Sequence, residues 1–321
     1  MRVVVCGVGA VGGVLAAALT RAGTEVIGIA RGAQLDAIRE NGLLVRSPNE
    51  DFAARFDCAA SPSEISFRSD DVIFLTMKTQ DTEDALDQLR ASGVRDQAIF
   101  CFQNGVANER MALRRFSNVH GVTVMMPCSY LQAGRVSVRA APRFGLFDIG
   151  RYPSGSDETD AAVASRLEAA NFGAFVLDDV MQSKYGKLLL NLGNMIEAAV
   201  GPGVDSRVLR DRVRKEGEAV LRAAGITWVD VGAGDPRRDA MMRTTEVPGE
   251  DRPGGSTVQS LNRSTGRVEA DFLNGEIARI ARMTGVQAPL NAALADLGAR
   301  LAREGQGAGS MSLDQLNALL T

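Results

Sequence analysis

A glycine-rich turn near residue 7 constrains the fold of this chain more than any other feature. The sequence RVVVCGVGAVGGVLAAAL places Gly7, Gly9 and Gly12 in G-x-G-x-x-G register, directly after an apolar strand pattern and at the start of a helical pattern. In this arrangement the first glycine permits a tight turn and the second lets the backbone approach a pyrophosphate. The third allows the helix to pack closely on the strand. The helix amino end then offers N–H groups and a positive dipole end to an anion. The motif therefore predicts a dinucleotide-binding strand–helix–strand unit.

Apolar strand patterns alternate with helical patterns over the first half of the chain. Strands are expected at 2–6, 25–30, 71–75, 98–102, 119–124 and 144–149, with helices between them at 11–22, 32–41 and 82–92. The strands lack the polar alternation of a half-exposed sheet, which is typical of a parallel sheet covered on both faces. This alternation predicts an α/β fold with a doubly wound, mostly parallel sheet.

The pattern changes after residue 178. A helix at 159–171 and a strand at 174–177 complete the first part. Beyond them, apolar residues recur at three- and four-residue spacing in 180–200, 206–224, 268–284 and 290–303, and this spacing is helical. We expect an N-terminal Rossmann-type dinucleotide-binding domain at 1–178 and an all-helical C-terminal domain at 179–321. The stretch 233–256, which holds three prolines, is expected to include an ordered loop.

Composition excludes several kinds of site. The chain has a single histidine, His120, so a histidine-rich metal site, a Ser-His-Asp triad or a histidine-dependent dehydrogenase mechanism is hard to build. A formal net charge of −3 gives no basic footprint for nucleic acid. The four cysteines form no C-x-x-C pair, so neither zinc nor a redox dithiol is indicated: Cys6, Cys58, Cys101 and Cys128. No metal is expected, and free thiols among apolar neighbours favour a reducing compartment.

Residues 3–20 imitate the apolar part of a secretory signal because they carry no charge and follow an arginine. They also contain four glycines between Gly7 and Gly13, and a second strand pattern follows at once. Strand, tight turn and buried helix explain this segment better than a signal does. No later segment approaches an uncharged membrane span, so a soluble, cytoplasmic protein without a membrane partner is expected.

The end of the second predicted strand bears on the choice of cofactor. An NAD site would place Asp or Glu there to bind the ribose hydroxyls, whereas this chain has Arg31. A guanidinium pairs with a 2′-phosphate through two parallel bonds, which predicts NADP. The alternative is that Arg31 is only a solvated loop charge.

If a bound nicotinamide reduces a carbonyl group, a positioned acid must deliver a proton to the resulting alkoxide. His120 lies between apolar residues and is expected to be a satisfied strand-end histidine, and no tyrosine has a Y-x-x-x-K partner. Only four of the 36 basic residues are lysine, and they are Lys78, Lys184, Lys187 and Lys215. In a chain that favours arginine so heavily, lysines are candidates for chemistry that an always-protonated guanidinium cannot perform.

Lys187 is the strongest of these candidates. In SKYGKLLLNLGN it lies four residues before Asn191, so the two share a helix face. Burial would make the ammonium a better acid, while Asn191 would hold a substrate oxygen. The alternative is an amphipathic helix with a lysine that reaches solvent. Lys78 and Asn104 follow two apolar strands at the edge where a doubly wound sheet binds ligands, although both residue types are also common in turns.

These motifs together resemble the ketopantoate reductase (2-dehydropantoate 2-reductase) family over nearly the whole chain. The resemblance rests on GVGAVGG with Arg31, MKTQ, QNG, the KLLLN helix, and GGSTVQS followed by VEADFLNG. It implies a Rossmann domain, a helical domain and a cleft between them. It also implies NADPH-dependent reduction of a branched 2-oxo acid, ketopantoate or a close analogue, to the 2-hydroxy acid.

The resemblance also assigns roles to individual residues. Lys187 resembles the catalytic acid, and Glu269 the carboxylate that assists it and contacts the cofactor. Asn191 and Ser256 resemble substrate ligands, and Asn104 a ligand of both cofactor and substrate. Lys78 resembles an NADP contact, as Arg31 does. For Glu269, the alternative is an ordinary position on a helix surface.

Three departures from the family pattern fall on the substrate side. Met195 occupies the position of the second asparagine in K-x-x-x-N-x-x-x-N, and Ser260 replaces the aspartate of S-x-x-x-D. An asparagine that usually precedes the serine is missing from 251–256. Because buried hydrogen-bonding groups dominate discrimination among similar substrates, a different and more apolar 2-oxo acid is an alternative to ketopantoate.

Two other functions compete with a 2-oxo acid reductase. One is an NADP-dependent dehydrogenase of a different small hydroxy acid on the same two-domain plan. The other is a non-catalytic NADP-sensing protein, which would need neither Lys187 nor Glu269. The helical domain is a candidate homodimer face, but no heptad seam specifies a dimer.

Overall fold

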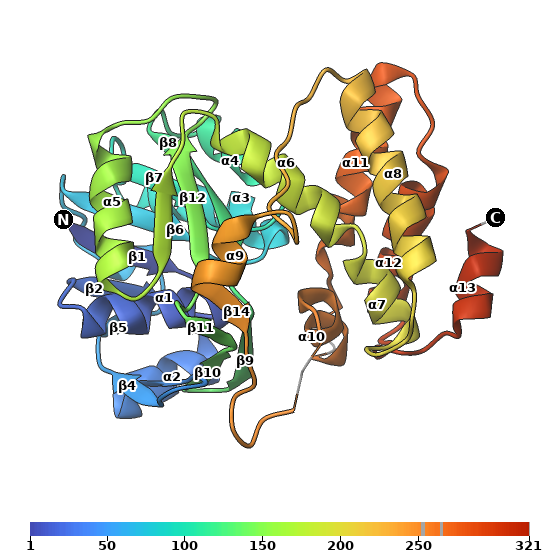
Figure 1. The fold of residues 1–321 in the computed structure, drawn as a ribbon. Helices are drawn as coiled ribbons and strands as arrows, with labels where there is room; N and C mark the ends of the chain where they lie inside the picture. The colour runs from blue at the N-terminus through green and yellow to red at the C-terminus, as the bar shows by residue number, and fades with distance from the viewer. Residues whose placement is uncertain (252–253, 264–265, 321) are drawn as a thin grey trace. The chain divides into compact units, whose positions relative to one another are not determined.

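The computed structural model describes residues 1–251, 254–263 and 266–320, and the chain divides into two compact units. Unit 1 consists of residues 1–104, 108–184 and 233–250, and unit 2 of residues 105–107, 185–232 and 251–321. The predicted domains differ from these units at 105–107, 179–184 and 233–250. The predicted fold class, a Rossmann-type sheet followed by a helical part, is confirmed (Figure 1).

An eight-stranded sheet forms the centre of unit 1. Its order is β5 (Asp57–Ala59), β2 (Val26–Ile29), β1 (Arg2–Cys6), β6 (Asp71–Leu75), β7 (Ala98–Cys101), β8 (Val119–Met125), β12 (Leu146–Arg151) and β13 (Gly173–Val176). The strands from β5 to β8 are all parallel, and β12 then pairs antiparallel with β8 and parallel with β13. The chain leaves β1 first toward β2 and later toward β6. The strand order therefore reverses between β1 and β6, which is where open α/β sheets bind ligands.

Helices cover both faces of this sheet. They are α1 (Ala10–Arg21), α2 (Gly32–Asn41), α3 (Thr82–Ala91), α4 (Asn108–Leu113) and α5 (Glu158–Ala169), with short 3₁₀ turns η1 (Pro62–Glu64) and η2 (Thr79–Asp81). Helix α5 packs against β12 and β13 (Figure 1). Leu86 and Leu89 of α3 and Ala112 of α4 share a buried apolar cluster with residues of β1, β6 and β7. Burial on both faces explains why these strands are apolar without alternation.

A second, four-stranded sheet was not foreseen from the sequence. It consists of β4 (Phe52–Ala54), β3 (Leu43–Arg46), β10 (Arg135–Val138) and β9 (Cys128–Gln132). Helix α1 contacts β1 and β2 of the first sheet and all four of these strands. A Cβ at Gly13 would lie 3.0 Å from Val136 Cγ1 and 3.2 Å from Leu43 Cδ2. Helix α1 is therefore buried between two sheets, which explains its nearly uniform apolar sequence.

The segment 233–250 belongs to unit 1, although it follows helices of unit 2 in sequence. It contains α9 (Pro236–Met241) and β14 (Met242–Thr244), and β14 pairs antiparallel with β11 (Ala140–Pro142). Arg237 of α9 donates through Nη1 to the buried carboxylate of Asp148 on β12, at 2.6 Å. A helix and a strand thus occupy 236–244, and residues 245–251 after them form no helix or strand, as expected of a loop within 233–256.

Unit 2 is helical. Its helices are α7 (Asn194–Val200), α8 (Arg207–Ala223), α10 (Ser256–Asn262), α11 (Asn274–Thr284), α12 (Pro289–Arg303) and α13 (Leu313–Leu319), with the 3₁₀ turn η3 (Glu269–Phe272). Helices α8, α11 and α12 pack against one another. The predicted single helices at 180–200 and 268–284 are each two elements. None of the helices in the described part of the chain combines the length and the apolar character that a bilayer crossing requires.

Helix α6 (Val180–Asn191) begins in unit 1 on a patch of the sheet without side chains. Gly121 of β8 and Gly150 of β12 are paired neighbours in the register of those strands. A Cβ at Gly121 would lie 3.0 Å from Val180 Cγ1, and a Cβ at Gly150 would lie 3.2 Å from Val180 Cβ. The paired glycines therefore let the start of α6 approach the sheet closely.

We expect Gly150→Ala to lower the free energy of unfolding by about 1–3 kcal/mol, the usual cost of overpacking a close contact. The added methyl would overlap the carbonyl oxygen of Leu177 and crowd Val180. Urea unfolding followed by circular dichroism measures the effect. Gly275→Ala is the control, because its methyl would meet its nearest neighbour at 3.5 Å, an ordinary contact. Equal midpoints for the two variants would contradict the close seating of α6.

Candidate functional site

The glycine turn between β1 and α1 has the geometry that the motif predicted. Gly7 has a φ of +101°, a left-handed value that favours glycine, and a Cβ there would lie 2.9 Å from the backbone nitrogen of Met77. A Cβ at Gly12 would overlap the carbonyl oxygen of Gly7 and the hydroxyl of Thr76. The turn therefore packs directly against the residues that follow β6.

The amino end of α1 is open to an anion. Gly9 is its N-cap, no side chain caps the helix, and its first turn contains no acidic residue. Apart from the chain neighbours of Gly9, no described atom lies within 4 Å of the position that a Cβ there would occupy. An uncapped helix end presents N–H groups and a positive dipole end, which suits a phosphate group.

Thr76 holds the turn in place, and sequence reasoning did not single it out. Its hydroxyl lies 2.9 Å from the carbonyl oxygen of Cys6 and 2.8 Å from that of Gly7, the last of β1 and the first of the turn. Burial raises the pKa of the neighbouring Cys6 thiol to about 12, so this cysteine is a small apolar core residue rather than a nucleophile.

Arg31 follows β2 at the same edge of the sheet. It is exposed, serves as the N-cap of α2, and has an extended backbone. Its Nη2 lies 3.5 Å from Oε1 of Gln88 on α3, at the outer limit of a hydrogen bond. A guanidinium held this loosely is available for a phosphate without breaking a strong ion pair.

A buried polar network connects the loops that carry Lys78 and Asn104. Asn108 accepts a hydrogen bond from the Thr82 hydroxyl at 2.8 Å, and its Nδ2 donates to the Thr79 hydroxyl and to the backbone carbonyl of Asn104. The amide of Gln103 donates to the Thr82 hydroxyl at 3.2 Å. Lys78 directly precedes Thr79, and Asn104 directly follows Gln103. The network therefore fixes the two loops relative to each other.

The structure brings the predicted cofactor ligands of unit 1 to one edge of the sheet. The glycine turn, Arg31, Lys78 and Asn104 follow β1, β2, β6 and β7, and these are adjacent parallel strands. The carboxyl ends of adjacent parallel strands meet at a common edge. Lys78 and Asn104 are partly buried there, and Arg31 is exposed.

Lys187 and Asn191 both lie on α6 within unit 2, four residues apart on one face. Lys187 is half-buried, and Asn191 is only 6% exposed. A half-buried ammonium beside a buried amide is suited to contact a polar group of a ligand. The predicted acid and the predicted substrate ligand therefore occupy the same helix face.

Ser256 and Glu269 also lie in unit 2. Ser256 is the first residue of α10, where the preceding Gly255 donates its backbone N–H to Glu197 at 3.4 Å. Glu269 begins η3 and is 8% exposed, so it is not the exposed helix-surface residue that was the alternative. A carboxylate this deeply buried requires a polar partner or a ligand.

The residues that depart from the family pattern on the substrate side lie on α7, on α10 and in the stretch 251–256. Met195 is fully buried on α7, and a Cβ at Gly298 of α12 would lie 3.0 Å from its sulfur. The Ser260 hydroxyl donates to the carbonyl of Ser256 within α10, at 2.9 Å. Of the stretch 251–256, residues 252 and 253 lie outside the described residues.

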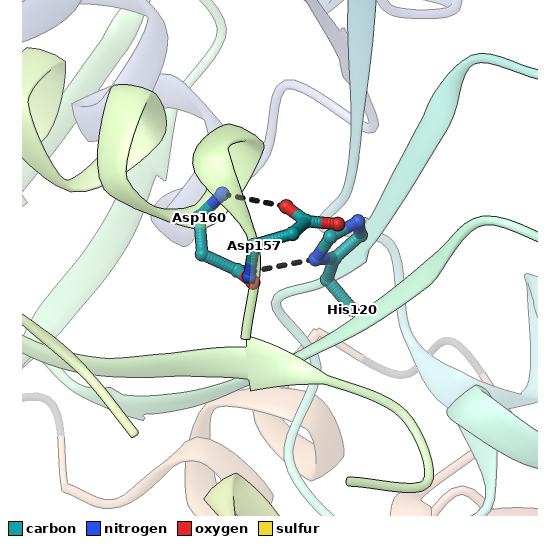
Figure 2. Close-up of side chains that lie close together, drawn as sticks. All are labelled: His120, Asp157 and Asp160. Atoms are coloured by element: carbon teal, nitrogen blue, oxygen red, sulfur yellow. Dashed lines mark hydrogen bonds and ion pairs between the residues drawn. The ribbon is translucent and has the colours of Figure 1, made fainter. Parts of the chain in front are cut away.

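His120 is engaged away from this edge. Figure 2 shows its ring beside Asp157 and Asp160, with Nδ1 lying 2.7 Å from Asp160 Oδ1. Its Nε2 lies 2.9 Å from Asn118 Oδ1, and the ring stacks on Phe100. The ring is fully buried, which agrees with the prediction of a satisfied strand-end histidine rather than a proton donor.

The two aspartates beside His120 cap a helix. Asp157 and Asp160 form a capping box at the start of α5, and Asp157 also pairs with Arg151. Ligand atoms of His120, Asp157 and Asp160 lie within 4.8 Å of one another, close enough to hold a metal ion. Each of these side chains already has protein partners, so the cluster is explained by helix capping.

Two family models match the chain. Residues 3–153 match the model described as ketopantoate reductase PanE/ApbA, and residues 179–301 match ketopantoate reductase PanE/ApbA C terminal. A 2-dehydropantoate 2-reductase of Pyrococcus horikoshii is 28% identical over 299 residues, which cover 91% of this chain and 94% of that protein.

Solved structures are similar over almost the same length. A PanE/ApbA family ketopantoate reductase from Ralstonia eutropha JMP134 has a TM-score of 0.77 at 28% identity, covering 95% of this chain and 100% of that chain. A D-mandelate dehydrogenase bound to NADH and anilino(oxo)acetate has a TM-score of 0.74 at 20% identity, covering 99% and 100%. The second similarity concerns the fold alone.

Two alanine variants separate the roles of the glycines. Gly9→Ala is expected to fold like the natural chain but to weaken binding of a pyridine nucleotide about tenfold or more, or ~1.4 kcal/mol, because its methyl fills the open helix end. Gly12→Ala is expected to lower the free energy of unfolding by about 1–3 kcal/mol, because its methyl overlaps Gly7 and Thr76. NADPH fluorescence titration and urea unfolding measure the two effects. Unchanged NADPH affinity in Gly9→Ala would remove the turn as the pyrophosphate site.

Proposed function

The chain belongs to the ketopantoate reductase family, and we propose that it uses NADPH to reduce a 2-oxo acid to the corresponding 2-hydroxy acid. Family membership makes it a pyridine-nucleotide-dependent oxidoreductase that acts on a CH–OH group of a small molecule. The observation that carries the choice of NADPH is the placement of Arg31 beside the glycine turn, where an NAD site would have a carboxylate.

The residues at the carboxyl edge of unit 1 fit a dinucleotide. The uncapped start of α1 and the open space at Gly9 suit a pyrophosphate, which the first N–H groups of α1, after Gly9, would bind. Arg31 would pair with the 2′-phosphate, while Lys78 and Asn104 would bind the rest of the cofactor. When bound, NADPH supplies the hydride that reduces the carbonyl carbon of the substrate.

Lys187 would complete the reaction as general acid. A hydride delivered to the carbonyl carbon leaves negative charge on the oxygen, and a positioned ammonium both stabilises that charge and donates the proton. Glu269 would assist Lys187 and contact the cofactor. Asn191 and Ser256 would hold polar groups of the substrate. A protein that only senses NADP would need neither Lys187 nor Glu269.

The substrate is expected to be more apolar than ketopantoate. Met195 places a buried thioether where the family has an amide, and the Ser260 hydroxyl is already bonded within its own helix. Both changes leave fewer polar groups to recognise the hydroxyl of ketopantoate. A dehydrogenase of a different small hydroxy acid on the same fold is the second candidate function. Met195 and Ser260 favour it.

A panel of 2-oxo acids, followed by loss of NADPH absorbance, tests the function. We expect turnover of at least one branched aliphatic or aromatic 2-oxo acid, with ketopantoate included for comparison. Lys187→Met is expected to lower kcat by about 10²- to 10⁴-fold, the usual contribution of general acid catalysis. NADPH binding should persist, because the glycine turn and Arg31 are intact.

Lys215→Met is the matched control. Lys215 is exposed on α8 and pairs with Asp211 at 2.7 Å, so its loss should leave kcat unchanged. Tight NADPH binding with no turnover of any acid would support the sensing protein instead. An unchanged kcat in Lys187→Met would exclude Lys187 as the acid.

Arg31→Glu is expected to reverse the cofactor preference. The ratio of kcat/KM for NADPH over NADH should fall by about 10- to 100-fold, because hydrogen bonds to a charged phosphate are worth roughly 1.5–3 kcal/mol. Arg39→Ala is the control, since Arg39 is exposed on the same helix and pairs with Glu64. Equal efficiencies with NADH and NADPH in the natural chain would overturn the assignment.

A further inference from the structure

Lys184 is a buried lysine for which the proposed reaction has no use. It lies on α6, three residues before Lys187, and its side chain is 2% exposed. Its ammonium donates to three backbone carbonyl oxygens, those of Cys101, Gln103 and Val122, at 3.3, 3.1 and 3.2 Å. These carbonyls belong to the end of β7, the loop after it, and β8. One side chain of α6 thus joins three backbone segments of unit 1.

A buried carboxylate balances the charge of this lysine. Glu109 on α4 forms an ion pair with the Lys184 ammonium, and its side chain has no exposed area. Charged groups are rarely buried this completely unless they are paired, because desolvation of a single charge is costly. The Lys184–Glu109 pair therefore acts as one neutral unit between α6 and α4.

The sheet leaves room for this pair. A Cβ at Gly121 of β8 would lie 3.5 Å from Lys184 Cδ and 3.7 Å from Glu109 Oε1. Gly121 faces away from the His120 cluster, because successive residues of a strand point to opposite faces. The lysine stem and the carboxylate therefore lie directly over the sheet at Gly121.

The pair acts on the backbone next to Asn104. Lys184 holds the carbonyl of Gln103, the residue before Asn104, and Asn108 donates to the carbonyl of Asn104 itself at 3.2 Å. Asn108 and Glu109 are neighbours at the start of α4. Lys184 therefore fixes the backbone before Asn104, and Asn108 fixes the carbonyl of Asn104 itself. The ion pair between Lys184 and Glu109 connects these two anchors, because Glu109 directly follows Asn108.

We propose that Lys184, paired with Glu109, is a positioning residue for the reductase. It fixes the backbone that presents Asn104, and it anchors the turn of α6 that precedes Lys187. An ammonium suits this task better than an apolar side chain, because it satisfies several converging carbonyls at once. The inference rests on the proposed function for the roles of Asn104 and Lys187.

A double variant tests the proposal without leaving a single buried charge. Lys184→Met/Glu109→Gln replaces both groups by neutral side chains of similar size. We expect kcat for the best 2-oxo acid of the panel to fall about 10- to 100-fold, the usual effect of a small misplacement of reacting groups. The dissociation constant of NADPH should rise by less than kcat falls, because only the contact of Asn104 is disturbed while the glycine turn and Arg31 are untouched. A purely structural pair would lower the urea midpoint and leave kcat of the folded protein unchanged.

Hydrogen exchange gives a readout that does not depend on turnover. Backbone amides of residues 101–109 should exchange about tenfold faster in the double variant, because the carbonyl anchors are lost. Lys215→Met/Asp211→Asn is the matched control, since it removes an exposed lysine–carboxylate pair on α8. This control should change neither kcat nor exchange at 101–109.

The outcomes separate this inference from the proposed function. No turnover of any 2-oxo acid by the natural chain would refute the proposed function. Amide hydrogen exchange at residues 101–109 would then be the only test of whether the Lys184–Glu109 pair anchors this backbone. Unchanged kcat or unchanged exchange in the double variant would overturn the positioning role. If the double variant does not fold, Lys184→Arg is the second variant, because it keeps both charges but replaces the single nitrogen that bonds the three carbonyls by a planar guanidinium. It should lower kcat in the same direction, and an unchanged kcat there would also overturn the proposal.

Discussion

Close packing at two glycines, Gly7 and Gly12, determines the candidate cofactor edge of unit 1. The turn at Gly7 lies against the backbone of Met77, and Gly12 leaves room for the Thr76 hydroxyl, which bonds the carbonyls of Cys6 and Gly7. This contact joins the end of β1 to the end of β6, the point where the strand order reverses. Any side chain larger than hydrogen would separate the two strand ends and move the start of α1. The position of every predicted ligand at this edge depends on that close approach.

The features that the sequence predicted correctly are those with a local physical cause. The glycine turn was identifiable because only glycine tolerates the φ of Gly7 and the contacts of Gly12. The parallel strands were identifiable because burial on both faces requires continuous apolar runs, such as residues 72–75 of β6. The burial of His120 followed from its apolar neighbours. Placement of ligand residues after these strands required only the rule that parallel strands share an edge.

Features that depend on distant residues were missed. Strands β3 and β10 are each four residues long and pair across about 90 residues of sequence, so neither had a local signal. The apolar spacing ran through Gly193, and so the break between α6 and α7 was not foreseen. Lys184 appeared in the sequence only as one of four lysines in a helical pattern. Nothing near it in the chain indicated that carbonyls from β7 and β8 converge on its ammonium.

The return of segment 233–250 to unit 1 gives the two units an interleaved connectivity. The chain crosses from one unit to the other next to residues 104, 107, 184, 232 and 250. No single cut therefore yields two complete pieces. A fragment that starts after residue 178 would carry β14 away from β11 and leave the hydrogen-bonding edges of both strands unpaired. Recombination that exchanges everything after residue 178 between related proteins is therefore restricted. The exchanged piece would carry β14, which must pair with β11 of the part left behind.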